Sequence, residues 1–517
     1  MTGAAEVRTF VRGRGRRRPT WTDRYSTLLG IGMLVLLAFP AIDHMVSAVP
    51  REVDPARAGA GLALIALLVA GSLAAARAFG PVAVSAADAA WLVLSPLPRR
   101  GVLARTLLVL GVVCAVGGAA VGLGLLGALG ASDELPLRLL TAVVIGTAWT
   151  LGGMSAAVLA QAWQTWDGRL VTTIIALAVA AVAVTAMSMG PGQGSLAWIA
   201  SAPVAAWSAA ATASAAVAAA LTGRAWTAVP RIPARAVLDA SARTGNVTAA
   251  VGVMDPSSLT WIAEDAHWRS RVLRSRAWPS RLRGVAAVAW LDWRRLARRP
   301  GRLALVAATP VLPVLAARAG GGTSGALIVL AVGALAAAAT GTAGACRDAG
   351  DPALARLLGS GPRALLAARA VLPALLGGAW LTLALAALDL SGSLNIPGSL
   401  DISGSGGPLR TPGPLWLLGP LCAPALAAGA LRLARRRPID HAMPALDTVI
   451  GMVPLGPVLW ALTGADIALL GCLPALTAIT GGVTAPLLAA QAVSGAAVLA
   501  ALCFKVPAHG ARLAAHT

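Results

Sequence analysis

The chain has 517 residues, of which 57% are hydrophobic and only 12% are charged, and its mean hydropathy is +0.76. So little polar surface cannot coat a soluble protein of this size, which excludes a soluble globular fold. The net charge of +21 lies mostly between the hydrophobic segments, a placement that favours loop arginines contacting anionic headgroups and predicts no nucleic-acid partner.

The apolar segments are continuous runs of about 20 residues without the period-2 alternation of a membrane barrel. The predicted fold class is therefore an all-α integral membrane protein with about twelve transmembrane helices. Six arginines within residues 8–18 precede the first run, residues 25–40, and such a basic flank predicts a cytoplasmic N-terminus. A signal peptide is the alternative, because residues 46–49 resemble a cleavage site, but the basic region is long for one.

Five more helices complete the first half, which we place at residues 1–222. They are predicted at residues 59–79, 103–130, 139–160, 170–189 and 196–221. Their connections alternate in charge, with arginines on one side and with Asp133, Glu134 and the uncharged turn 190–194 on the other. The arginines of the first side are Arg77, Arg99, Arg100, Arg105 and Arg169. The arginine side is expected to be cytoplasmic, as is the C-terminus.

Residues 223–302 form a basic, proline-broken cytoplasmic linker. Its segment 268–283 mixes Trp and Leu with arginines, so it is either an amphipathic helix along the headgroup plane or a solvated loop. The second unit, residues 303–517, repeats the plan of the first. Its helices are predicted at residues 303–317, 325–346, 370–390, 413–433, 443–463 and 483–504. Residues 466–482 are apolar but interrupted, and counting them as a crossing would put Lys505 on the wrong side, so we expect a re-entrant or interfacial hairpin.

An internal repeat is the most informative pattern. Residues 94–105 (LSPLPRRGVLAR) align without gaps on residues 358–369 (LGSGPRALLAAR), and each copy leads into the third helix of its half. The matched pairs are Pro98 with Pro362, Arg99 with Arg363 and Arg105 with Arg369. An acidic residue precedes each copy, Asp88 in the first half and Asp351 in the second. A Trp-x-Asp pattern also precedes the first helix of each half, as Trp21 with Asp23 and as Trp290 with Asp292. We therefore predict a duplicated six-helix unit. Taken singly, arginine and proline at a cytoplasmic helix junction are also common topology and turn residues.

At these residues the chain resembles the permease subunits of ABC exporters of the second type. Residues 350–369 resemble the cytoplasmic loop between the second and third helices of that family, and residues 88–105 look like a second copy. The resemblance implies coupling helices at 91–94 and 353–358 that dock on ATPase subunits, and amphipathic elbows at 21–25 and 290–296. The coupling residues implied are Asp88, Trp91, Pro98, Arg99, Arg100, Arg105, Asp351, Pro362, Arg363 and Arg369, and the elbow residues are Trp21, Asp23, Trp290 and Asp292. The family's Gly-Thr-Leu-Glu core is absent, and Asp88 is one residue out of register with Asp351.

The chain lacks the residue patterns of an enzyme. A nucleotide-binding P-loop needs Gly-Lys-Ser/Thr, whereas the only lysine is Lys505. Cysteines and histidines show no metal or disulfide spacing. The GxGxxG of residues 122–127 lies inside an apolar helix, where Gly118 and Gly122 predict helix packing instead. Gln491 is the main polar side chain at mid-helix, and it either bonds a neighbouring helix or faces a substrate path.

The function expected is therefore that of a fused two-unit permease of the cell membrane. It would export an amphipathic or hydrophobic substrate using separate ATPase subunits, and it would carry no cofactor itself because ATP binds to the partner. The alternative is a non-transporting membrane scaffold or immunity protein with a permease-like fold. Whether further membrane subunits join it is left open by the sequence.

Overall fold

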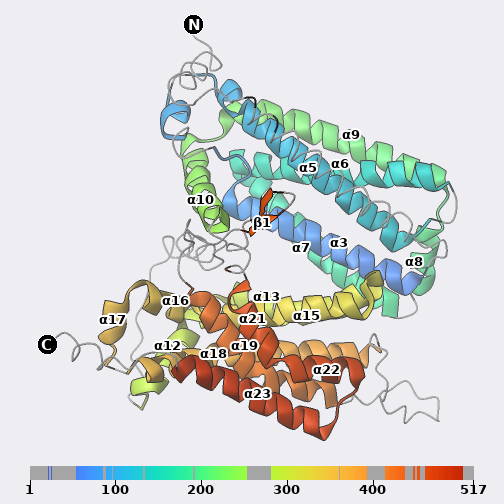
Figure 1. Ribbon diagram of the computed structural model, residues 1–517. Coiled ribbons are helices and arrows are strands. Elements are labelled where there is room, and N and C mark those ends of the chain that lie inside the picture. The colour runs from blue at the N-terminus through green and yellow to red at the C-terminus, as the bar shows by residue number, and fades with distance from the viewer. Residues whose placement is uncertain are drawn as a thin grey trace. The chain divides into compact units, whose positions relative to one another are not determined.

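The computed structural model describes residues 21, 25, 54–84, 89–95, 97–131, 134–189, 192–252, 281–359, 361–392, 414–436, 446–448, 451–453, 460 and 462–504. Nine helical spans among these residues are long and apolar enough to cross a membrane. The chain is therefore an all-α, multi-pass membrane protein. It divides into two compact units, Met1–Ala249 and Ala250–Thr517 (Figure 1).

Unit 1 is a bundle of long helices that run up and down beside one another (Figure 1). Its helices are α3 (Pro55–Phe79), η1 (Ala89–Val93), α5 (Arg99–Leu129), α6 (Leu135–Ala162), α7 (Gln164–Met189), α8 (Gln193–Ala200), α9 (Val204–Ala228), η2 (Val229–Arg231) and α10 (Ala234–Gly252). Asp54 caps the start of α3 by accepting a hydrogen bond from Ala56 N at 2.9 Å, and Gly80 ends that helix with a φ of 85°. The first predicted span, residues 25–40, lies outside the described residues apart from Tyr25.

The last span of unit 1 differs from the prediction. The sequence predicts one helix over residues 196–221, but the structure has the short helix α8, a break before Pro203, and then α9. Pro203 cannot donate a backbone hydrogen bond and restricts the residue before it, so the long helix begins only at Val204. The span is shifted accordingly, and it continues to Ala228.

Glycines bring α5 and α6 into backbone contact. A Cβ on Gly122 would lie 2.7 Å from Val143 Cα, and one on Gly118 would lie 2.5 Å from Thr147 Cα. Thr150 Oγ1 donates a 2.8 Å hydrogen bond across this contact to Cys114 O. The predicted packing role of Gly118 and Gly122 is confirmed, because the small-xxx-small spacing lets the two backbones approach.

Unit 2 contains a second bundle and a small hairpin. Its elements are α12 (Gly284–Ala297), α13 (Pro300–Ala308), η3 (Thr309–Val311), α14 (Leu312–Ala316), η4 (Ala317–Gly321), α15 (Gly322–Ala339), α16 (Ala343–Gly350), α17 (Pro352–Arg356), α18 (Pro362–Leu390), η5 (Pro414–Leu417), α19 (Leu418–Ala434), β1 (Leu446–Thr448), β2 (Gly451–Val453), α21 (Ala465–Gly471), α22 (Leu473–Gly481) and α23 (Ala485–Phe504). Strands β1 and β2 pair antiparallel. The amphipathic segment predicted at 268–283 lies outside the described residues up to residue 280.

The helical stretch Pro300–Ala339 turns back on itself at Gly320. Gly320 has a φ of 102°, a conformation that favours glycine, and it separates α14 from α15. Both legs then pack along α18, since Trp380 Nε1 donates to Thr309 Oγ1 at 2.9 Å while a Cβ on Gly333 would contact the same indole. The two helices predicted at 303–317 and 325–346 therefore form a hairpin, but the second ends at Ala339, ahead of a close approach of Gly341 to α18.

The end of unit 2 corrects the helix predicted at residues 443–463. Within that range, Leu446–Thr448 and Gly451–Val453 form the strands β1 and β2. Prolines at positions 444, 454 and 457 disfavour a continuous helix over this sequence. Residues 466–482, predicted as a re-entrant or interfacial hairpin, contain the two short helices α21 and α22, and α21 lies beside α19. Contacts join Gly464 to Leu433, Ala468 to Gly429 and Gly471 to Ala425, so α21 is antiparallel to α19.

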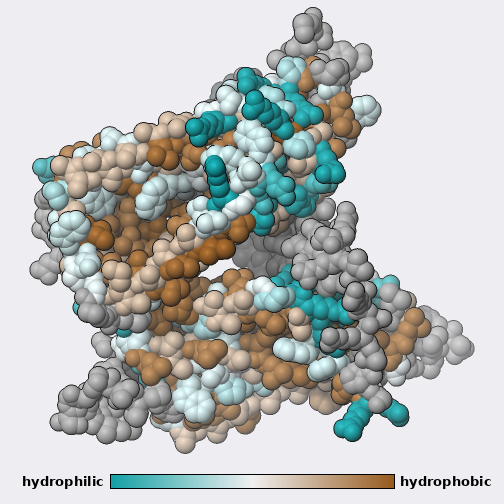
Figure 2. Space-filling view, turned by 180° about the vertical axis from the view of Figure 1, so that it is seen from behind, coloured by the Kyte–Doolittle hydropathy of each residue, from teal (hydrophilic) through white to brown (hydrophobic). Residues whose placement is uncertain are grey.

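Polarity is distributed unevenly along both bundles. Figure 2 shows hydrophobic colour along the sides of the helices and hydrophilic colour gathered toward one end of each unit. In unit 1 this end holds the start of α5 and the turn between α6 and α7, and in unit 2 it holds α12 and the start of α18. We call it the arginine-rich end of each unit.

We expect Gly146→Ala to destabilise the protein by about 1–3 kcal/mol, because the added methyl group would collide with the backbone of Gly118 and Gly122 on α5. Gly117→Ala is the matched control, since a Cβ there meets nothing within 4 Å. Unfolding of both variants in detergent, followed by circular dichroism, measures the difference. Equal stability of the two variants would show that the contact does not hold α5 against α6.

Candidate functional site

A buried ion cluster holds three helices together at the arginine-rich end of unit 2. Arg369 on α18 donates to Asp348 on α16 through two bonds, Nε to Oδ2 at 2.8 Å and Nη2 to Oδ1 at 3.0 Å. Its Nη1 donates to Oδ1 of Asp292, on α12, at 2.5 Å. This bidentate pair and the third bond fix the orientation of the guanidinium. The predicted elbow residue Asp292 and the predicted coupling residue Arg369 are thus in direct contact.

The central ion pair of this cluster is almost completely buried. The Arg369 side chain is 4% exposed and that of Asp292 is 3% exposed. Burial raises the pKa of the Asp292 carboxyl above its ordinary value, while the charges of Arg369 and Arg295 oppose that shift. Gly344 on α16 lies so close that a Cβ there would overlap Arg369 Nη1 and Asp292 Oδ1. The position therefore needs glycine for the ions to meet.

The segment of unit 2 for which a coupling helix is predicted contains the short helix α17. Its residue Ala355 packs against the cluster formed by Val288 of α12 with Leu365 and Ala368 of α18. Leu357, immediately after the helix, is 80% exposed, and Leu358 is also exposed. One side of this segment is thus anchored to the bundle, and large apolar side chains extend from the other side.

The remaining predicted residues of this loop lie around the start of α18. Pro362 is the first residue of that helix, which suits a residue without an N–H. Arg363 is exposed and stacks over the ring of Phe504 at 5.4 Å. Asp351 is exposed, and Trp290 is half-buried on α12.

The predicted coupling segment of unit 1 has a similar arrangement. It forms η1, in which Val93 is buried against Val102 and Leu103 of α5. Trp91 on the same turn is 80% exposed, and Leu94 follows it at the surface. Asp88 and Asp23 lie outside the described residues, and Trp21 is exposed.

The arginines of this segment make contacts that differ from those of unit 2. Helix α5 starts at Arg99 after Pro98, one residue from the equivalent start of α18. Arg99 Nη1 donates to Ile232 O at 2.5 Å. Arg100 and Arg105 are exposed. The alignment pairs Arg105 with Arg369, yet only Arg369 is buried among acids, so the matched positions share a place along the helix but have different contacts.

Three polar residues that the sequence analysis did not single out anchor these segments. In unit 1, Gln161 accepts a hydrogen bond from Val82 N at 3.1 Å and donates one to Val82 O at 3.2 Å. Asp167 pairs with Arg77 at 2.6 Å, and Asp348 is the bidentate partner of Arg369. An arginine inside an apolar helix requires an acidic or carbonyl partner. The position of Arg369 therefore predicts such a partner, and Asp348 could have been considered for that reason.

Gln491 binds a neighbouring helix element. Its Oε1 accepts from Ala475 N at 3.0 Å, and its Nε2 donates to Gly471 O at 2.8 Å. These are the two backbone groups that an uninterrupted helix would pair with each other across the α21–α22 junction. The side chain is fully buried. It therefore completes the broken helix, while a role in a substrate path stays a prediction.

Within the described ranges, no group of three His, Cys, Asp or Glu residues could hold a metal ion. The features that stand out are two anchored segments with exposed apolar side chains, each preceding a long helix at an arginine-rich end. Such surfaces can contact a partner protein.

We expect Arg369→Met to cost about 3–5 kcal/mol, because Asp292 and Asp348 would stay buried without their cation. Gly344→Ala should lower stability in the same direction, since the methyl group displaces the ion pair. Arg363→Met is the control, because that side chain is exposed. Thermal unfolding in detergent compares them. Wild-type stability of Arg369→Met would mean that the cluster does not join the three helices.

Comparisons with known proteins give a family without an assigned activity. A search of the curated proteins and a search of the solved structures each found no significant match. Residues 54–444 match the model of DUF6297, described as a family of unknown function. Because this match covers most of the 517 residues, the chain belongs to the DUF6297 family.

Proposed function

We propose that this protein is the membrane-spanning permease component of an ATP-driven exporter, powered by separate ATPase subunits and moving an amphipathic or hydrophobic substrate. One observation carries the proposal. Each unit has a short helical segment that is anchored on one side and exposes Trp91 or Leu357 on the other, directly before a long helix. Each of two ATPase subunits would then bind one of these two segments.

The exposed side chains fit a protein partner. Trp91 and Leu357 lie outside the apolar spans, so burial in the hydrocarbon core does not account for their exposure. Trp is enriched among the residues that dominate binding energy at protein interfaces, and a surrounding polar rim is typical of such sites. The exposed Arg356 on α17 supplies a polar group to that rim.

The proposed topology is two six-helix units in the cell membrane with both termini in the cytoplasm. In unit 2, the described course supports six crossings: the two legs of Pro300–Ala339, then α18, α19, the α21–α22 element and α23. In unit 1, α3 starts at the end opposite to Arg99, so one crossing before α3 brings the N-terminus to the arginine-rich end. The excess of arginine assigns that end to the cytoplasm.

Movement of the ATPases would reach the membrane helices through the anchored segments. Closure of two ATPase subunits on ATP would displace η1 and α17, and Ala355 of α17 packs against the cluster that Val288 of α12 forms with Leu365 and Ala368 of α18. The Arg369 cluster links α12, α16 and α18, so these helices would move as one body. Transport also requires contacts that differ between inward-open and outward-open states.

The energy source belongs to the partner in this proposal. The only lysine, Lys505, is followed by Val506 and so cannot complete a P-loop. ATP would therefore bind on the ATPase subunits, and this chain would supply the path and the docking surface. The lipid bilayer surrounds the protein, and no nucleic acid is a partner in this proposal.

We expect the protein, reconstituted in nanodiscs, to stimulate ATP hydrolysis by a P-loop ATPase encoded beside its gene. Trp91→Glu combined with Leu357→Glu should reduce this stimulation at least about tenfold, because both apolar anchors would become charged. Trp198→Glu is the matched control, since Trp198 is 75% exposed on α8, at the end of unit 1 away from Arg99. Trp91 and Leu357 are substituted rather than the predicted coupling residue Arg99, because Arg99 binds Ile232 O within the bundle.

Two outcomes would contradict the proposal. Unchanged stimulation by the double variant would remove the docking role of η1 and α17. Failure of the wild-type protein to bind the ATPase in co-purification would favour the alternative function, a non-transporting scaffold or immunity protein that has a permease-like fold.

A further inference from the structure

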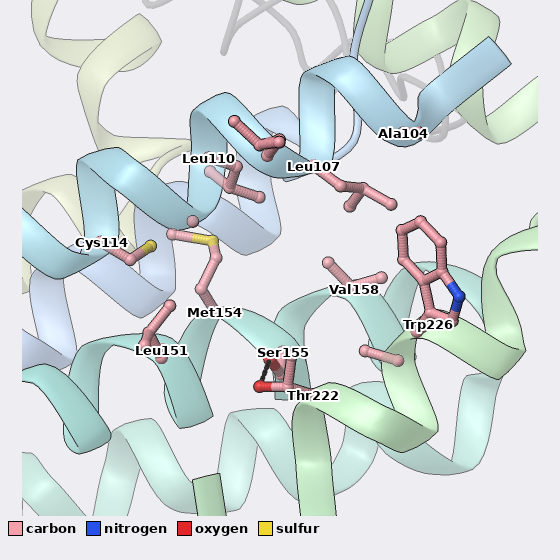
Figure 3. A pocket seen from close by; sticks show the side chains of 13 residues that line it. Ala104, Leu107, Leu110, Cys114, Leu151, Met154, Ser155, Val158, Thr222 and Trp226 are labelled. Carbon is pink, nitrogen blue, oxygen red and sulfur yellow. Dashed lines mark hydrogen bonds between the residues drawn. The ribbon is translucent and has the colours of Figure 1, made fainter. Parts of the chain in front are cut away.

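A cavity of about 280 Å³ opens among α5, α6 and α9 of unit 1. Figure 3 shows its walls, which include Leu107, Leu110, Met154, Val158 and Trp226. The volume is near the lower end of the range of about 300–1,000 Å³ for ligand pockets. It suits a slender apolar group rather than a bulky one.

The lining chemistry favours an apolar ligand in the body of the cavity. Its main polar groups are the hydroxyls of Ser155 and Thr222, which bond to each other at 3.0 Å (Figure 3). Thr222 Oγ1 also donates to Ala218 O at 2.8 Å, so Ser155 is the donor to Thr222. Both hydroxyl hydrogens are used within the protein. A hydrocarbon chain would find apolar contacts and would not break a hydrogen bond.

The cavity is open at the surface of unit 1. Leu108 on α5 is 68% exposed and Trp226 on α9 is 45% exposed, and both line it. The α5 and α9 spans that form this rim are long and apolar enough to cross a membrane. A lipid of a surrounding bilayer would enter the cavity sideways between them.

A positive charge lies where such a lipid would place its headgroup. Arg100, Ala104, Leu107 and Gly111 are spaced four, three and four residues apart, so they share one face of α5. Ala104 begins the cavity wall, and Arg100 lies about 6 Å further along the helix axis at the arginine-rich end. Arg105 lies one residue further into the span than Ala104 and on a different face of α5, about 140° around the helix from Arg100. Among the described residues, Arg100 has no acidic partner.

We propose that this groove binds one acyl chain of an anionic phospholipid, with the lipid phosphate held by Arg100. Arginine forms charge-assisted hydrogen bonds to phosphate oxygens, and basic residues beside a transmembrane helix attract anionic headgroups. The lipid comes from the leaflet at the arginine-rich end. The site lies in unit 1 and does not depend on an ATPase partner.

The test uses native mass spectrometry of the full-length, delipidated protein in detergent. Equimolar dioleoylphosphatidylglycerol and dioleoylphosphatidylcholine are added, and the lipid that stays bound is counted. The wild-type protein should retain one phosphatidylglycerol in preference to phosphatidylcholine. Gly111→Leu should weaken retention of that lipid at least about tenfold, because Gly111 lines the groove and a side chain there has open space to fill it.

Matched variants separate the chain from the headgroup. Gly117→Leu, on the same helix with equal open space but outside the lining, should bind like the wild type. Arg100→Gln should abolish the preference for phosphatidylglycerol, whereas Arg235→Gln, an exposed arginine of α10, should preserve it. Thermal unfolding without lipid checks that each variant is folded. Wild-type retention by Gly111→Leu, or an unchanged lipid preference in Arg100→Gln, would overturn the proposal.

Discussion

The arginine-rich end of unit 2 depends on one buried interaction, the guanidinium of Arg369 between two carboxylates. Asp348 and Asp292 are on different helices, and neither helix has another charged anchor of comparable burial among the described residues. An ion pair taken out of water is costly unless its geometry is close to ideal, and here the guanidinium satisfies one carboxylate bidentately. The pair therefore specifies how α12 and α16 sit on α18, and through α18 it positions α17.

The two units use different physical means for a similar arrangement. In unit 1 the segment between α3 and α5 is held by neutral hydrogen bonds from Gln161 and by the packing of Val93. In unit 2 the corresponding segment is held by ions and by the packing of Ala355. If both segments bind ATPase subunits, we expect unequal responses, because a buried charged joint resists displacement more than a neutral one.

Most membrane helices could be located from the sequence, because hydropathy and proline placement determine them in a bilayer. The local structure of residues 443–463 and 466–482 could not. Hydropathy favoured a helix in the first stretch, where the structure has the strands β1 and β2, and the interrupted second stretch contains the short helices α21 and α22. The interrupted stretch succeeds as a helix because Gln491, remote in sequence, pairs with Gly471 O and Ala475 N at the break. The candidate site was predictable only in part: Asp292 was singled out by the Trp-x-Asp pattern and Trp91 by the family resemblance, while Asp348 required knowledge of tertiary contacts.

The central claim is that the arginine-rich ends face the cytoplasm, where an ATPase can reach them. Cysteine labelling in intact cells tests it most directly, using a background in which the five native cysteines are replaced. Leu357→Cys should react with a membrane-impermeant maleimide only after the cells are permeabilised, whereas Trp198→Cys should react without permeabilisation. Labelling of Leu357→Cys in intact cells would contradict the account.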